Sequence, residues 1–83
     1  MNTAKEAAKV IVYKKIDART DIADTTKDFL KDIANNFIDN AFDRLKSEYE
    51  KLSQDEIEKD LEVLATRNIE NVYGSYNRKV DKK

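Results

Sequence analysis

The chain has 83 residues, a net charge of −1, one glycine, and no proline, cysteine or histidine. Without cysteine and histidine it lacks the thiol and imidazole groups on which disulfides, most nucleophilic triads and most transition-metal sites depend. A single glycine also excludes a glycine-rich phosphate-binding loop. We therefore expect no enzyme activity, no catalytic or metal site, no cofactor and no small-molecule substrate.

The length fits a single domain over residues 1–83. No apolar run approaches the roughly 20 residues of a membrane span. The run VIVY at 10–13 is too short for a signal peptide and is followed by Lys14 and Lys15. These patterns predict a cytoplasmic, intracellular protein that does not act at a membrane.

The first predicted helix covers residues 4–17. Thr3 and Glu6 have the spacing of a capping box, in which each side chain caps the backbone amide of the other. Apolar residues then recur at helical spacing at Ala4, Ala8, Ile11, Val12 and Ile16. A polar break follows at 17–21, and the candidate N-caps of the next helix are Asp21, Asp24 and Thr25.

The second predicted helix is long, from about 22 to 51, with a break at Asn35 and Asn36 as the alternative. Its apolar residues recur every four positions, which exceeds the 3.6-residue period, so the apolar stripe rotates along the helix. No single straight neighbour covers such a stripe, so either two neighbours cover it in turn or the helices wrap about one another. The later part of this stripe contains Phe37, Ile38, Phe42 and Tyr49.

The third predicted helix covers residues 54–73. Ser53 and Glu56 form a second capping-box pattern, and Leu52 and Ile57 have the spacing of a hydrophobic staple. The apolar face contains Ile57, Leu61, Leu64, Ala65, Ile69 and Val72. Gly74 is the expected C-terminal stop, and we expect the basic segment 75–83 to fray.

These elements predict an all-α fold, either a small helical bundle or an antiparallel helical hairpin. The flanking helices carry barely enough apolar residues to cover the central helix, so we expect a homodimer or another protein to complete the core. A self-sufficient monomer is the alternative.

Charge is unevenly spread along the chain. Residues 1–20 and 63–83 each hold five basic and two acidic residues, whereas residues 21–62 hold six basic and thirteen acidic ones. We expect the basic ends to fold back on the acidic middle. One face of the central helix gathers Asp21, Asp28, Asp32, Asp39, Asp43 and Glu50. This ridge is either a solvated face or a docking surface for a basic partner.

The pattern favours a protein-binding regulator or inhibitor that docks through a helix face, as accessory proteins of phages and mobile elements often do. The predicted contact residues are Phe37, Ile38, Phe42 and Tyr49, with Asp32, Asp39 and Asp43 as steering charges. The alternatives are a structural homo-oligomer and an acidic DNA mimic that inhibits a nucleic-acid-binding protein. Nucleic acid itself is not the expected partner, because the basic residues form no continuous face.

Overall fold

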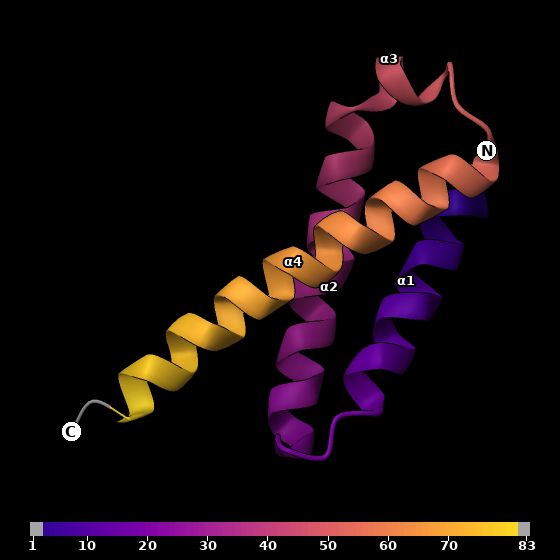
Figure 1. Ribbon diagram of the computed structural model, residues 1–83. Coiled ribbons are helices and arrows are strands. Elements are labelled where there is room, and N and C mark those ends of the chain that lie inside the picture. Colours follow the sequence, from indigo (N-terminus) through magenta and orange to yellow (C-terminus); the bar gives the residue numbers. More distant parts are fainter. Residues whose placement is uncertain (1–2, 82–83) are drawn as a thin grey trace.

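The protein is all-α in the computed structural model, which describes the backbone of residues 3–81 and the side chains of residues 3–74. The helices are α1 (Thr3–Asp17), α2 (Asp24–Arg44), α3 (Lys46–Tyr49) and α4 (Gln54–Asp81). Helices α1 and α2 form an antiparallel pair, and α4 crosses this pair obliquely (Figure 1). The predicted small helical bundle is confirmed.

Helix α4 begins beside the beginning of α1, so these two helices start at the same end of the bundle (Figure 1). The backbone N–H of Ala4 donates a 3.2 Å hydrogen bond to Oε1 of Gln54. Farther along, Lys15 pairs with Glu62, and Arg19 pairs with Glu70. Residues of α1 and of the loop after it therefore face residues of α4 about fifty positions later in the sequence.

The core consists of Tyr49 and one row of residues from each long helix, spaced every four positions. The buried rows are Ala4, Ala8, Val12 and Ile16 on α1, Leu30, Ala34 and Ile38 on α2, and Ile57, Leu61, Ala65 and Ile69 on α4. Rows of this spacing are inclined to the helix axis, and their interdigitation favours oblique crossings. Each row includes an alanine with no exposed surface, which lets the helices approach closely.

The N-terminal helix begins within one residue of its predicted start. The prediction of one continuous central helix from 22 to 51 was wrong. Helix α2 ends at Arg44, and the chain turns at Leu45 (φ −100°, ψ 14°) into the four-residue α3. The alternative break at Asn35 and Asn36 does not occur either, because both residues lie inside α2. The turn brings Tyr49 into the core and leads the chain back to Gln54 beside α1.

The C-terminal helix begins as predicted but does not stop at Gly74. Its start has both capping-box bonds: the Ser53 N–H donates to Oε1 of Glu56 at 2.9 Å, and the Glu56 N–H donates to Oγ of Ser53 at 3.3 Å. Gly74 has no positive φ, so it forms no left-handed cap, and α4 continues to Asp81. The backbone of 75–81 is helical; residues 82–83 and the side chains from 75 onward lie outside the described residues, so the fraying of this segment remains a prediction.

The other predicted caps do not form. Helix α2 is capped by Ala23, without a side-chain hydrogen bond, because the carboxylate of Asp21 is held by Arg19. At the other predicted box, Thr3 is already helical and the Ala4 N–H bonds to Gln54. The partner of Asp21 is local, two residues away, whereas the partner of the Ala4 amide is distant in the sequence.

The basic N-terminal segment does fold back on the acidic middle of the chain. Nζ of Lys9 lies 2.8 Å and Nζ of Lys5 lies 3.3 Å from Oδ1 of Asp39. Lys15 likewise pairs with Glu62. The matching expectation for the C-terminal segment falls largely on side chains outside the described residues.

Candidate protein-docking face

The structure changes the set of residues available for a contact on α2. Ile38 has no exposed surface and Tyr49 is 5% exposed, so both belong to the core of the single chain. We correct the prediction for these two residues, because neither side chain can reach a partner while the chain is folded. The physical reason is the turn at Leu45, which rotates Tyr49 inward.

Two further predicted contact residues are covered by α1. Nζ of Lys5 lies 5.2 Å from the centroid of the half-buried Phe42 ring, which also packs against Tyr49 with the ring centroids 6.0 Å apart. Asp39 is held by Lys9 and Lys5, and the hydrogen bond from Lys9 is the main cause that lowers the pKa of this carboxyl. Phe42 and Asp39 therefore act mainly in the contact between α1 and α2.

Phe37, Asp32 and Asp43 remain available at the surface. Phe37 is half-buried and both aspartates are exposed. Phe37 also continues an apolar strip that begins at Phe29, which is 53% exposed, and passes through the half-buried Ile33. These three residues follow one another at four-residue spacing, so they are neighbours on the helix surface.

The strip leads into a groove between α2 and α4. Its apolar lining comes from Phe37, Ala41 and Leu45 and, across the groove, from Leu64. Asn40 and Arg44 add polar atoms, and the groove encloses about 300 Å³. We call the strip and the groove together the α2–α4 face, defined by Phe29, Ile33, Phe37, Asn40, Ala41, Arg44, Leu45 and Leu64.

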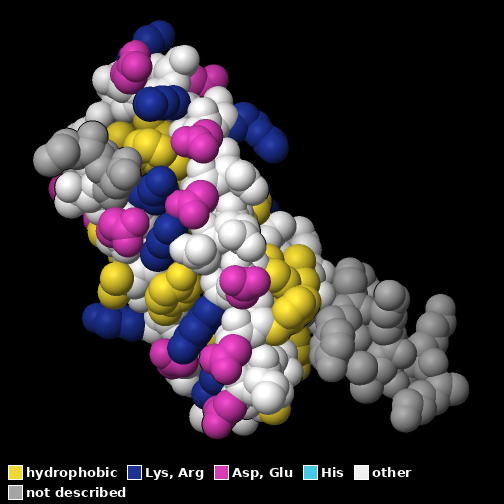
Figure 2. Space-filling view, turned by 180° about the vertical axis from the view of Figure 1, so that it is seen from behind, with side chains coloured by type: hydrophobic (Ala, Val, Ile, Leu, Met, Phe, Trp, Pro, Cys, Tyr) yellow, Lys and Arg dark blue, Asp and Glu magenta, His cyan; other side chains and the backbone are white. Residues whose placement is uncertain are grey.

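Only some carboxylates of the predicted acidic ridge are without an ion pair among the described residues. Asp21 and Asp39 form ion pairs, whereas Asp28, Asp32, Asp43 and Glu50 are exposed and have no ion pair among the described residues. On the side opposite α4, acidic and basic side chains intermingle, and hydrophobic side chains reach the surface between them (Figure 2). Three of these carboxylates, Asp28, Asp32 and Asp43, lie on α2, which also carries the exposed Arg44.

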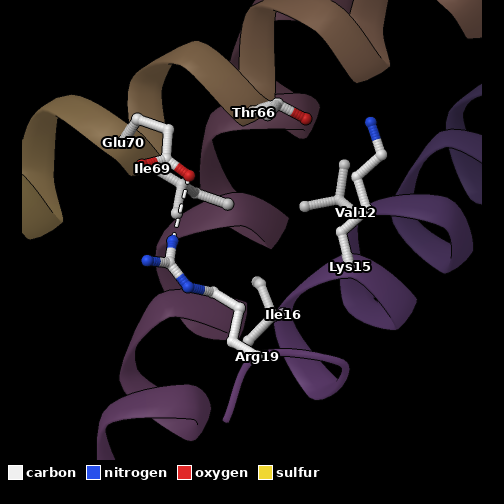
Figure 3. Close-up of a pocket in the computed structure, with 7 residues that line it drawn as sticks. All are labelled: Val12, Lys15, Ile16, Arg19, Thr66, Ile69 and Glu70. Carbon is white, nitrogen blue, oxygen red and sulfur yellow. Dashed lines mark hydrogen bonds and ion pairs between the residues drawn. The ribbon is translucent and has the colours of Figure 1, made fainter. Parts of the chain in front are cut away.

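A second pocket lies between α1 and α4, where apolar side chains from the two helices point toward one another (Figure 3). Val12, Ile16 and Ile69 form its apolar part. It holds about 30 Å³, enough for one water molecule. Oγ1 of Thr66 is buried there without a hydrogen-bond partner among the described residues. This volume is too small for a metabolite.

Arg19, at the edge of this pocket, contacts three other side chains. Its guanidinium donates two hydrogen bonds to Asp21 and one, at 3.0 Å, to Oε2 of Glu70, and it lies 4.9 Å from the centroid of the Tyr73 ring. Figure 3 shows the bond to Glu70 as a dashed line. Arg19 therefore fastens the α1–α2 loop to α4.

A third, open hollow of about 440 Å³ is lined by Ile11 of α1 and by acidic residues of α4 with Lys59. Within the part of the chain that the structure describes, no group of three or more histidine, cysteine, aspartate or glutamate side chains is placed to hold a metal ion. The same part contains no helix that is both long and apolar enough to cross a membrane.

Comparison with protein-family models, curated proteins and solved structures found no match for this chain. The functional argument therefore rests on the α2–α4 face.

Phe29 and its neighbour Leu30 both belong to the apolar stripe of the central helix, but only Leu30 occupies the core, with 1% of its surface exposed. The signal that identifies the correct row is the alanine at its centre. Leu30, Ala34 and Ile38 match the rows of α1 and α4, each of which also has alanine at an inner position. Phe29, Ile33 and Phe37 form the adjacent row and remain partly outside the core.

Proposed function

We propose that this protein is a non-enzymatic binding module that docks another protein on its α2–α4 face. The observation that carries the proposal is Phe29, an aromatic residue 53% exposed, in line with the partly exposed Ile33 and Phe37 beside a groove. Scattered single apolar residues need no explanation, but a connected apolar strip beside a groove is typical of an interaction site. Binding there would regulate or inhibit the partner by covering part of its surface.

The alternatives from the sequence receive less support. A DNA mimic needs a continuous acidic face, and the ion pairs of Asp21 and Asp39 interrupt this one. A structural homo-oligomer that needs a second chain to complete its core is not favoured, because the described helices already bury a row from each long helix. Identification as an accessory protein of a phage or mobile element has no structural support.

The experiment is site-specific photo-crosslinking in cells that produce the protein. A photoreactive amino acid replaces Phe29 in one variant and Val63, which is 45% exposed on α4, in the control. We expect one protein to be crosslinked from position 29 and not from position 63. Binding of that protein, measured with both components purified, should be lost in Phe29→Asp and retained in Val63→Asp.

Circular dichroism of each variant establishes that it is folded. Phe29 and Val63 both lie on helix surfaces, so we expect both aspartate variants to keep the helical signal of the parent. Equal binding by the two variants would refute the α2–α4 face as the docking site.

A further inference from the structure

We infer that α4 exchanges between two copies of this chain, so that each α4 packs on the α1–α2 pair of the other copy, and that the chain opens by straightening at Leu45. The inference goes beyond the proposed function and does not depend on it. Its evidence is the connection from α2 through α3 to α4, which forms an arch at one end of the bundle (Figure 1).

The break between α2 and α3 is confined to one residue. Leu45 has φ −100° and ψ 14°, and the helix resumes at Lys46. To continue α2 into α3, the main change is in ψ of Leu45, which must reach about −42°, the usual helical value. The amides of residues 46–48 donate no backbone hydrogen bond among the described residues, and in a straight helix they would bond to α2.

The sequence of this region favours the straight form. No glycine or proline lies between residues 24 and 53 to impose a bend. The apolar residues Phe42, Leu45 and Tyr49 keep helical spacing across the break. The fold therefore bends a segment whose local pattern predicts one continuous helix, so tertiary contacts must hold the bend.

Tyr49 makes the contacts that hold the bend. Its ring is 5% exposed and packs against Phe42, and its hydroxyl donates a 2.7 Å hydrogen bond to Oδ2 of Asp60 in α4. In a straight helix, residue 49 lies about 7.5 Å beyond Arg44 along the α2 axis, at about 1.5 Å per residue. The bond to Asp60 of the same chain is then lost, so Tyr49 opposes the opening.

The other described contacts of α4 form equally well between two chains. Helix α4 packs through its buried row and through ion pairs such as Lys15–Glu62 and Arg19–Glu70. These residues lie outside the connection, so a second copy supplies the same α4 surface to the same α1–α2 pair. Exchange of an identical element is a low-cost route to a dimer, because the core stays the same.

The exchange changes which chains build the α2–α4 face. In the exchanged dimer, Leu64 of one copy faces Phe37 of the other across each groove. The symmetric dimer has two identical faces, whereas the monomer has one. A binding partner with two matching sites would bind the dimer more tightly than the monomer. The concentration of the protein would therefore set how many faces each particle presents.

The test reverses the Lys15–Glu62 ion pair between α1 and α4. Lys15→Glu and Glu62→Lys each bring like charges together within one chain. When the two variants are mixed, exchange of α4 gives opposite charges at both α1–α4 contacts, whereas a side-by-side dimer of intact bundles does not. After joint refolding from urea at about 50 mM salt, light scattering should show about tenfold more dimer than in either variant alone. Equal amounts of dimer would overturn the inference.

Two further variants test the hinge. Lys46→Pro is compatible with the bent form, where the amide of Lys46 donates no backbone hydrogen bond, but it interrupts a straight helix. Tyr49→Phe removes the bond to Asp60 and favours opening. After refolding at about 1 mM, Lys46→Pro should stay monomeric, and Tyr49→Phe should dimerise at least about fivefold more tightly than the parent. Lys46→Ala and Tyr13→Phe are the matched controls, which should dimerise like the parent.

Circular dichroism establishes that each variant is folded, and the charge-reversed mixture decides the matter if Lys46→Pro is not. Dimers of equal strength in Lys46→Pro and Lys46→Ala would show that two copies associate without straightening at Leu45, which would overturn the inference. A parent that stays monomeric after refolding at the high concentration, with no dimer in the charge-reversed mixture, would overturn it as well.

Discussion

The hydroxyl group of Tyr49 donates a 2.7 Å hydrogen bond to Oδ2 of Asp60 and thereby ties the α3 turn to α4. The ring above this hydroxyl is 5% exposed and packs against Phe42. The bond links two segments that are joined by a short connection from Glu50 to Ser53. Tyr49 therefore fixes the place where the chain reverses from α2 to α4.

Replacing Tyr49 with phenylalanine should lower the free energy of unfolding by about 1 kcal/mol, because the ring packing remains and only the hydrogen bond is lost. Urea denaturation measures the change. Tyr13→Phe is the matched control: Tyr13 is half-buried, and its hydroxyl has no hydrogen bond among the described residues. A Tyr49→Phe variant as stable as the parent would show that this bond does not hold the turn.

The environment of Tyr49 also leads us to predict that the folded protein loses stability at alkaline pH. Burial, followed by the hydrogen bond to Asp60, raises the pKa of the Tyr49 hydroxyl above its usual value near 10. The unfolded chain then loses this proton at lower pH than the folded chain, so stability is fully present below about pH 10 and falls as the pH rises beyond it. Urea midpoints from pH 8 to 11 should fall more for the parent than for Tyr49→Phe, and parallel curves would contradict the assignment.

The sequence predicted the helices best where the signal was local. The Ser53–Glu56 capping box formed because its partners are three residues apart and face solvent. Local signals failed where another residue formed a competing bond: Arg19, two residues away, holds the carboxylate of Asp21, and the distant Gln54 accepts a hydrogen bond from the amide of Ala4. A tertiary partner such as Gln54 leaves no trace in a single sequence.

The candidate face was predicted only in part for a related reason. A helical wheel places Phe29, Ile33 and Phe37 on an apolar arc that also includes the core row one residue later. Which of the two adjacent rows is buried depends on how closely the neighbouring helices approach. The alanines Ala8, Ala34 and Ala65 set that approach, and together they favour the row of Leu30 and Ile38.

The ion pairs of Asp39 lead us to predict that the α1–α2 contact becomes less stable in acid. Because Lys9 and Lys5 lower its pKa, its contribution is present above the unfolded value near 3.9 and is lost as the pH falls through the lower folded pKa. The carboxylate is 40% exposed, so Asp39→Asn should cost less than about 1 kcal/mol at pH 7, and salt should reduce the effect. Asp32→Asn is the control, and an equal loss of stability there would contradict the specific role of Asp39.

Replacing Thr66 with valine should make the protein more stable. Its buried Oγ1 has no hydrogen-bond partner among the described residues, and valine has nearly the same shape without the hydroxyl. Thr66→Val should therefore raise the free energy of unfolding by up to about 1 kcal/mol, because it removes an uncompensated polar group. Thr25→Val, at an exposed position on α2, is the control. A loss of stability in Thr66→Val would instead show that a bound water satisfies the hydroxyl.

A substitution at Gly74 distinguishes most directly between the structure, in which α4 continues past this residue, and the sequence prediction, in which the helix stops there. In a left-handed cap, where the sequence placed it, an alanine would be strained and the protein would lose about 1 kcal/mol. In the continuous helix of the structure, Gly74 has no positive φ, and an added Cβ atom meets nothing within 4 Å. Gly74→Ala should therefore stabilise the protein by up to about 1 kcal/mol through helix propensity.

Thermal and urea denaturation of Gly74→Ala give the sign of this change. Asn71→Ala, an exposed change to alanine one turn earlier in α4, shows how much any alanine contributes there, and glycine should gain more because its propensity is lower than that of asparagine. A destabilised Gly74→Ala variant beside an unaffected Asn71→Ala variant would mean that α4 ends near residue 73 in solution. Because that end would also remove the helical backbone of 75–81, circular dichroism of chains truncated after residue 74 would then show no loss of helical signal.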